Sequence, residues 1–158
     1  MNKKALSERD ICTKFITPAL EKAGWDLQTQ VREEVSFTKG KVIVRGHLVK
    51  RGQPKRADYI LYYKPGIPIA VIEAKDNTQT VGAGMQQALS YANGDTLDLP
   101  FAYSSNGDAF LEHDRTKATG RVERELPLES FPSPEELWRR YRAAKGIDEK
   151  INEIVAQD

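Results

Sequence analysis

Two runs of β-branched and aromatic residues, separated by a Pro-Gly turn, constrain the fold of this chain more than any other feature. The first run covers residues 57–63, the second covers 69–75, and Pro65-Gly66 lies between them. Runs of this kind, bounded by turn residues, predict two β-strands that pair antiparallel as a hairpin. Residues 69–72 of the second run are almost continuously apolar, which is typical of a strand with both faces buried. The hairpin therefore predicts a sheet that is covered on both sides.

Charged residues gather at one end of this hairpin. If the pairing is symmetric about Pro65-Gly66, Asp58 lies opposite Glu73, with Cβ atoms roughly 5 Å apart. Lys75 shares their face because side chains alternate along a strand. Two carboxylates so close raise the pKa of one of them unless a cation neutralises the pair. Mg²⁺ or Mn²⁺ suits such hard oxygen ligands, and a water on the metal can attack a phosphodiester.

The same residues also have simpler interpretations. Asp58 and Glu73 can be charges at a sheet edge, and Lys75 can be a solvated strand end. A shift of one residue in the register would move Glu73 to the other face. A glycoside hydrolase with two carboxylates is disfavoured, because Lys75 would have no role and the carboxyl groups face each other across a ladder rather than across a sugar.

A helix is predicted near the N-terminus. Ser7-Glu8-Arg9-Asp10 has the form of a capping box, and apolar residues then recur at helical spacing through residues 11–23. Pro18 predicts a kink or a break in this helix, and Gly24 predicts its end. Glu8 lies in the first turn, where it either compensates the helix dipole or supplies a further acid to the metal site.

A second helix is predicted over residues 82–92, directly after the hairpin. Gln87 and Tyr91 are four residues apart and share a face, so they can brace Lys75 or contact a substrate. The alternative is a surface glutamine and a half-buried tyrosine. Gly82-Ala83-Gly84 resembles the start of a dinucleotide fingerprint, but Gln87 stands at the third glycine position and the chain contains no P-loop. We therefore expect no bound nucleotide.

The remaining segments predict further strands and helices. Strands are expected at residues 28–37, 41–50, 99–105, 109–113 and 121–126, and a helix from Ser133 to about Ala144 that Gly146 closes. A last short helix follows, and its apolar stripe has little chain left to pack on. We expect a domain over residues 1–145, and residues 146–158 as the start of a connection to a further domain.

The net charge of +1 shows no general affinity for nucleic acid, so any DNA contact must come from a local patch. The loop before Asp58 contains Lys50, Arg51, Lys55 and Arg56, which can bind phosphates beside the acids or can simply be solvated. The single Cys12 excludes an internal disulfide and a cysteine zinc site. No apolar run is long enough to span a membrane, and we expect a cytoplasmic protein.

Asp58, Glu73-Ala74-Lys75 and the spaced pair Gln87 and Tyr91 resemble the PD-(D/E)xK nuclease signature with its Gln-x-x-x-Tyr extension. Ala57 stands where the signature has proline, which is not a metal ligand. More closely, four segments resemble the N-terminal nuclease domain of type I restriction enzyme R (motor) subunits. They are Ser7 to Trp25, Arg56 to Tyr91, Phe101 to Gly107 and Ser133 to Ala144.

This resemblance implies an α/β, restriction-endonuclease-like fold with a central mixed β-sheet flanked by helices. It also implies Mg²⁺-dependent hydrolysis of double-stranded DNA, with metal bound by Asp58, Glu73 and the Ala74 carbonyl. Lys75 would orient the attacking water or stabilise charge on the phosphate. Methyltransferase and specificity subunits would be partners of the full-length chain, which would continue into an ATP-driven motor. The alternative is a non-catalytic module of the same fold that binds DNA or docks on a subunit.

Overall fold

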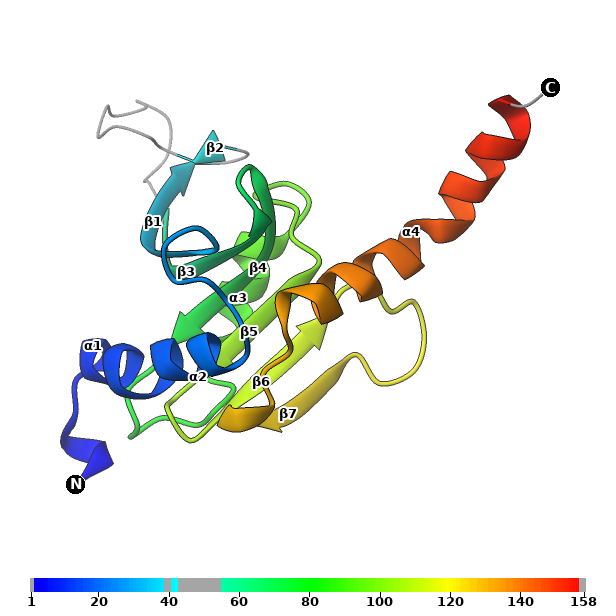
Figure 1. The fold of residues 1–158 in the computed structure, drawn as a ribbon. Coiled ribbons are helices and arrows are strands. Elements are labelled where there is room, and N and C mark those ends of the chain that lie inside the picture. The colour runs from blue at the N-terminus through cyan, green and yellow to red at the C-terminus, as the bar shows by residue number, and fades with distance from the viewer. Residues whose placement is uncertain (1, 39–40, 43–54, 157–158) are drawn as a thin grey trace.

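A mixed β-sheet forms the centre of the molecule (Figure 1). The computed structural model describes residues 2–38, 41–42 and 55–156, and within them the sheet has seven strands in the order β2-β1-β3-β4-β5-β6-β7. Only β4 and β5 pair parallel, and α3 connects them. The strands are β1 (Val31–Thr38), β2 (Lys41–Val42), β3 (Lys55–Lys64), β4 (Ile67–Ala74), β5 (Phe101–Ser105), β6 (Ala109–Asp114) and β7 (Glu123–Pro127).

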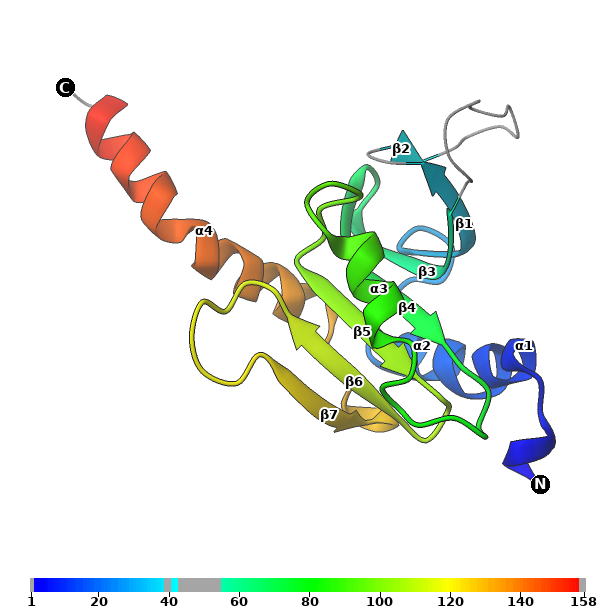
Figure 2. The same ribbon diagram turned by 180° about the vertical axis from the view of Figure 1, so that it is seen from behind.

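Helices cover both faces of this sheet, as predicted for an α/β fold. The short N-terminal helices and α4 lie on one face (Figure 1), and α3 lies on the other (Figure 2). The helical segments are η1 (Lys3–Ala5), α1 (Glu8–Ile11), η2 (Cys12–Ile16), α2 (Thr17–Lys22), α3 (Met85–Ala92), η3 (Leu128–Ser130) and α4 (Pro134–Ala156). None of the helices in the described ranges is long and apolar enough to cross a membrane.

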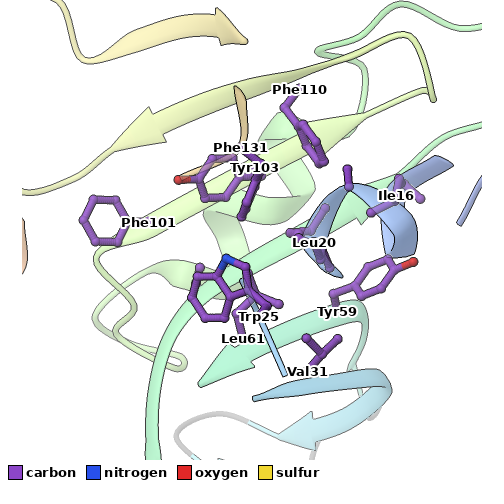
Figure 3. Close-up of a cluster of buried hydrophobic side chains, with 14 of the residues drawn as sticks. Ile16, Leu20, Trp25, Val31, Tyr59, Leu61, Phe101, Tyr103, Phe110 and Phe131 are labelled. Carbon is purple, nitrogen blue, oxygen red and sulfur yellow. The ribbon is translucent and has the colours of Figure 1, made fainter. Parts of the chain in front are cut away.

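Two clusters of buried apolar side chains hold these layers together. The cluster on the side of α2 and α4 is rich in aromatic rings (Figure 3) and includes Trp25, Tyr59, Phe101, Tyr103, Phe110 and Phe131. The cluster on the α3 side includes Phe37, Ile60, Val71, Met85 and Tyr91. Because both faces are buried, strand β4 is apolar along most of its length, as its sequence predicted.

The β3–β4 hairpin has the predicted register at its functional end. Tyr59 pairs with Ile72 and Leu61 pairs with Ala70, so the same register places Asp58 opposite Glu73. Closer to the turn the pairing is irregular between Leu61 and Lys64. The irregularity lies beyond the predicted site, and the symmetric pairing therefore holds where the site needs it.

The N-terminal helix follows its capping box, and of the kink or break predicted at Pro18 the break is absent. Ser7 Oγ accepts the N–H of Asp10, and the Asp10 carboxylate accepts the N–H of Ser7. The helix neither stops nor breaks near Pro18; instead residues Cys12–Ile16 form a π-helical turn and α2 begins directly after it. A π-turn shifts the hydrogen bonds by one residue, which accommodates the N–H that proline lacks.

Several predicted boundaries are wrong by a few residues. Strand β1 begins at Val31 rather than at Gln28, because the Asp26 carboxylate accepts the N–H of Gln28 and holds a turn there. Helix α3 begins at Met85 rather than at Gly82, and β5 begins at Phe101. Of the strand predicted at 41–50, Lys41–Val42 is present as β2, and the rest lies outside the described residues.

The helix stop predicted at Gly146 is also wrong. Helix α4 continues through this glycine to Ala156 and extends past the sheet (Figure 1). A glycine inside a helix costs only about 1 kcal/mol relative to alanine, and no proline follows to end the helix. Gly146 alone was therefore too weak a signal for a boundary.

Candidate metal and phosphate site

A polar pocket of about 360 Å³ lies where strands β3 and β4 meet the N-terminal end of α1. It brings together most of the residues predicted to act in a nuclease site. The predicted residues that line it are Glu8, Arg56, Asp58, Glu73, Ala74, Lys75 and Gln87, and they are joined by Glu34, which was not predicted. The structure thus gathers side chains from three strands and two helices at one place.

Asp58 and Glu73 form the centre of the pocket. The N–H of Asp58 lies 3.3 Å from Glu73 Oε2, and the N–H of Ala74 donates to Asp58 Oδ2 at 2.8 Å. Each carboxylate therefore contacts the backbone of the opposite strand. Glu73 is only 3% exposed, and its Oε1 atom has no hydrogen-bond partner within the described part of the chain.

Burial and charge repulsion act together on Glu73. Its burial raises its pKa to about 10, and the neighbouring Asp58 carboxyl contributes to this increase. Without a cation, Glu73 is therefore protonated at neutral pH, since ionisation would place a second negative charge beside Asp58 in a poorly solvated place. A cation bound at the pair would favour ionisation of Glu73.

The donor atoms of the pocket fit a hard divalent cation. Two carboxylates and the Ala74 carbonyl supply oxygen atoms alone, and the free Oε1 atom of Glu73 is available as a ligand. The residues that the structure describes contain no group of three or more His, Cys, Asp or Glu side chains placed to hold a metal. A metal here would therefore keep several waters, as Mg²⁺ does.

Lys75 and Glu8 lie at the edge of this pair. The Lys75 N–H donates to the Ser105 carbonyl at 2.9 Å, which fixes the end of β4 against β5. Partial burial raises the pKa of Glu8, the Asp58 carboxyl raises it further, and Lys75 opposes the increase. The charges of the pocket therefore act on Glu8, which also lies in the first turn of α1, where an acid compensates the helix dipole.

Helix α3 presents Gln87 to the pocket and buries Tyr91 behind it. Gln87 Nε2 donates to the Tyr91 hydroxyl at 2.6 Å, and the Tyr91 ring packs edge-on against Phe37. Burial raises the pKa of Tyr91, and Glu73 adds to the increase. The Lys55 ammonium lies 6.0 Å from the centre of the same ring. The predicted Gln-Tyr pair is thus one connected unit beside the carboxylates.

The glycines before α3 allow the helix to approach strand β4 closely. A Cβ atom on Gly84 would lie 3.1 Å from Glu73 Cβ and 3.1 Å from Ser104 Oγ. The Gly84 N–H donates to that hydroxyl at 2.9 Å. Gly84 therefore has a packing role directly behind Glu73.

The four predicted DNA-binding residues are placed differently from one another. Lys50 and Arg51 lie outside the described residues. Lys55 and Arg56 are the first residues of β3 rather than part of a loop, so the predicted loop ends earlier than expected. Both side chains are exposed, and Arg56 forms an ion pair with Glu34 at the mouth of the pocket.

Glu34 lines the pocket but was not predicted from the sequence. Its backbone has a φ of 52°, a left-handed conformation that is uncommon outside glycine, asparagine and aspartate. Strand β1 pairs with β3 on both sides of this point, through Glu33 with Tyr59 and Val35 with Ala57, and Glu34 and Asp58 both line the pocket. No residue type in the sequence signals this turn of the backbone, because glutamate rarely adopts it.

Residues 42–121 match the family described as "Type I restriction enzyme R protein N terminus". The chain belongs to this family. It is the N-terminal domain of a type I R subunit, and the matched segment contains Asp58, Glu73, Lys75, Gln87 and Tyr91. Glu8 and Glu34 lie before the matched segment, so their place in the pocket is known from the structure alone.

Two relatives of this R-subunit domain extend the match to nearly the whole chain. The type I restriction enzyme EcoAI endonuclease subunit of Escherichia coli is 47% identical over 159 residues, which cover 100% of this chain and 19% of that protein. A fragment of a putative HsdR subunit of a type I restriction enzyme from Vibrio vulnificus YJ016 superposes with a TM-score of 0.72. It is 44% identical, and the match covers 89% of this chain and 26% of the fragment. The chain thus spans about a fifth of the curated relative.

Proposed function

We propose that this domain hydrolyses DNA phosphodiester bonds in a reaction that depends on Mg²⁺, with Mn²⁺ as a substitute. The observation that carries the proposal is the Asp58–Glu73 pair, in which a buried glutamate with an unbonded oxygen lies beside a second carboxyl. Asp58, Glu73 and the Ala74 carbonyl would hold the metal. When bound, the ion supplies an activated water and polarises the phosphate.

The other residues of the pocket would position the substrate and the attacking water. Lys75, on the face of the carboxylates, orients the water or stabilises the charge that develops on the phosphate. Gln87 is held by Tyr91 and braces Lys75 or contacts the substrate from the α3 side. Glu8 lies at the opposite edge, where its raised pKa suits a group that holds or releases a proton near the metal water.

Membership of this family supports a proposal for the partners. We propose that double-stranded DNA is the substrate and that Lys50, Arg51, Lys55 and Arg56 contact its phosphates. In the full-length chain, the domain would act in the cytoplasm with methyltransferase and specificity subunits and with a motor. The resemblance to the PD-(D/E)xK signature assigns the same roles to Asp58, Glu73 and Lys75.

Calorimetric titration with Mn²⁺ tests the metal site directly. Wild type should bind, and Asp58→Ala should weaken binding by about tenfold or more, since one of the two carboxylate ligands is lost. Glu125→Ala removes an exposed acid on β7 and should bind as wild type does. Equal binding by wild type and Asp58→Ala would refute the metal assignment.

A plasmid-nicking assay with Mn²⁺ tests the chemistry. Lys75→Ala should lower the rate by about 100-fold or more, which is typical for removal of one group that stabilises developing charge. Lys64→Ala removes an exposed lysine at the other end of the hairpin and serves as the matched control. If Lys75→Ala cleaves at the rate of Lys64→Ala, Lys75 has no role in cleavage.

A further inference from the structure

Two arginines and two glutamates form a cluster of ion pairs, of which Arg56 and Glu34 line the pocket. Arg56, at the start of β3, donates from Nη2 to Glu34 Oε1. Arg9, in α1, lies with Nη1 3.8 Å from Glu34 Oε2 and with Nη2 2.7 Å from Glu33 Oε1. Arg9 and Arg56 are far apart in the sequence, and Glu34 is the carboxylate that both of them approach.

The position of Glu34 is unfavourable without these arginines. A residue other than glycine at positive φ is strained, by roughly 1–3 kcal/mol, and the φ of Glu34 is 52°. Glu34 also lines the same pocket as Asp58 and Glu73, and acidic side chains gathered in one place repel one another. The arginines supply the compensating charge, which explains why the carboxylate stays at the pocket mouth.

The chemistry of this cluster suggests what else could occupy it. A guanidinium group binds carboxylate and phosphate through the same planar fork of N–H donors. The side chains of Glu34 and Arg56 are 48% and 61% exposed, so an incoming phosphate can reach the arginine without any change in the core. A DNA phosphate carries one negative charge, as the Glu34 carboxylate does. If a phosphate took the place of this carboxylate, the arginines would still have one negative partner.

We propose that Arg9 and Arg56 form a binding site for a DNA phosphate and that Glu34 occupies this site, as a phosphate mimic, in the DNA-free protein. The proposal rests on the proposed function, since it assumes that DNA reaches this pocket. It adds Arg9 as a DNA contact and gives Glu34 a role as a competitor that weakens DNA binding. The simpler interpretation is an ion-pair cluster that only fastens α1 to the sheet.

The affinity for a short DNA duplex separates the two interpretations. Fluorescence anisotropy without divalent metal, over a series of salt concentrations, measures binding with no cleavage. Glu34→Gln should tighten binding by about two- to fivefold, the range expected for loss of a competing exposed ion pair. The logarithmic salt dependence should become steeper by about one, since one more phosphate contact forms. Glu125→Gln makes the same charge change on exposed β7 and controls for net charge.

Each outcome decides the proposal. Compared with Arg56→Ala alone, the double variant Glu34→Gln, Arg56→Ala should show a smaller gain, because only Arg9 then remains for Glu34 to block. The proposal is overturned if Glu34→Gln binds no better than Glu125→Gln, binds more weakly than wild type, or shows no DNA binding. The measurement uses neither metal nor cleavage, so a failed Mn²⁺ titration would remove the proposed function while leaving this result readable.

Discussion

Glu73 and Glu112 are two buried glutamates of the same sheet, and they differ in the hydrogen-bond and ion-pair partners of their carboxylates. They are 3% and 1% exposed, respectively. Glu112 Oε2 accepts the Tyr103 hydroxyl at 2.7 Å, and its Oε1 accepts Arg124 Nε at 2.8 Å and Arg140 Nη1 at 3.2 Å. Glu73 instead faces Asp58, and its Oε1 has no partner among the residues described.

This difference separates a structural acid from a ligand site. Glu112, Tyr103, Arg124 and Arg140 form a cluster, the Glu112 cluster, that links β5, β6, β7 and α4. In it, two arginines and a hydroxyl group compensate the charge of the Glu112 carboxylate. Asp114 nearby also has an unbonded buried oxygen, Oδ2, but Arg140 Nη1 lies 3.8 Å from it. At Glu73 no cation of the described chain takes that place. Burial of an acid alone is therefore a weak sign of function, and burial without charge compensation is a stronger one.

The largest expected effect comes from breaking the compensated cluster. Arg140 is 16% exposed and contacts Glu112, Asp114 and Glu136. Arg140→Met should lower the free energy of unfolding by about 3 kcal/mol, because the buried Asp114 loses its neighbouring cation and the buried Glu112 keeps only Arg124. Urea denaturation measures this change.

Arg139→Met is the matched control for Arg140. Arg139 is the next residue of α4, is 67% exposed, and forms an ion pair with Glu136 only at the surface. Exposed pairs contribute little, so this variant should lose less than about 0.5 kcal/mol. Equal losses in the two variants would show that the Glu112 cluster does not depend on its arginine.

The uncompensated site should respond in the opposite direction. In metal-free protein, Glu73→Gln should raise the free energy of unfolding at pH 8, because it removes a group whose ionisation the folded state resists. The pKa of Glu73 is about 10 when folded, against an ordinary value of 4.5. Its contribution to stability is therefore fully present below about pH 4.5 and is lost as the pH rises towards 10.

Thermal denaturation with EDTA at several pH values measures this prediction. Between pH 6 and 9 the stability of wild type should fall relative to that of Glu73→Gln, by at most about 1.4 kcal/mol per pH unit. Added Mn²⁺ should reverse the order, since only wild type keeps both carboxylate ligands. Parallel pH profiles of the two proteins would contradict the raised pKa of Glu73.

Much of the site could be predicted from the sequence because a strand hairpin follows simple geometry. Pro65-Gly66 defined the turn, and the alternation of side chains then placed Asp58, Glu73 and Lys75 together. The family match and the capping box at Ser7 likewise rest on local patterns. The overall α/β arrangement followed from the buried character of β4.

The rest depended on contacts between distant segments or on backbone shapes that residue types do not indicate. Glu34 adopts a conformation that glutamate disfavours, and the π-turn before Pro18 replaces the break that proline predicts. The Glu112 cluster is a further example, because only the β6–β7 register places Arg124 opposite Glu112. The sequence held no local signal for these three features.

The smallest expected effect compares one hydroxyl in each region. Tyr103 donates to the buried Glu112 carboxylate, so Tyr103→Phe should lower the free energy of unfolding by about 1.5 kcal/mol, as for hydrogen bonds to charged groups. The Tyr91 hydroxyl is bonded to Gln87, whose amide is exposed and can bond to water instead, so Tyr91→Phe should cost less than about 0.5 kcal/mol. Both rings keep their aromatic contacts, Tyr103 with Phe131 and Tyr91 with Phe37, so the comparison isolates the hydroxyl groups. The urea concentration at the unfolding midpoint, compared at an unchanged m-value, measures both changes in stability. If Tyr91→Phe costs as much as Tyr103→Phe, the Gln87–Tyr91 pair stabilises the fold as strongly as the compensated cluster does, and the proposed division between a structural and a functional region would fail at α3.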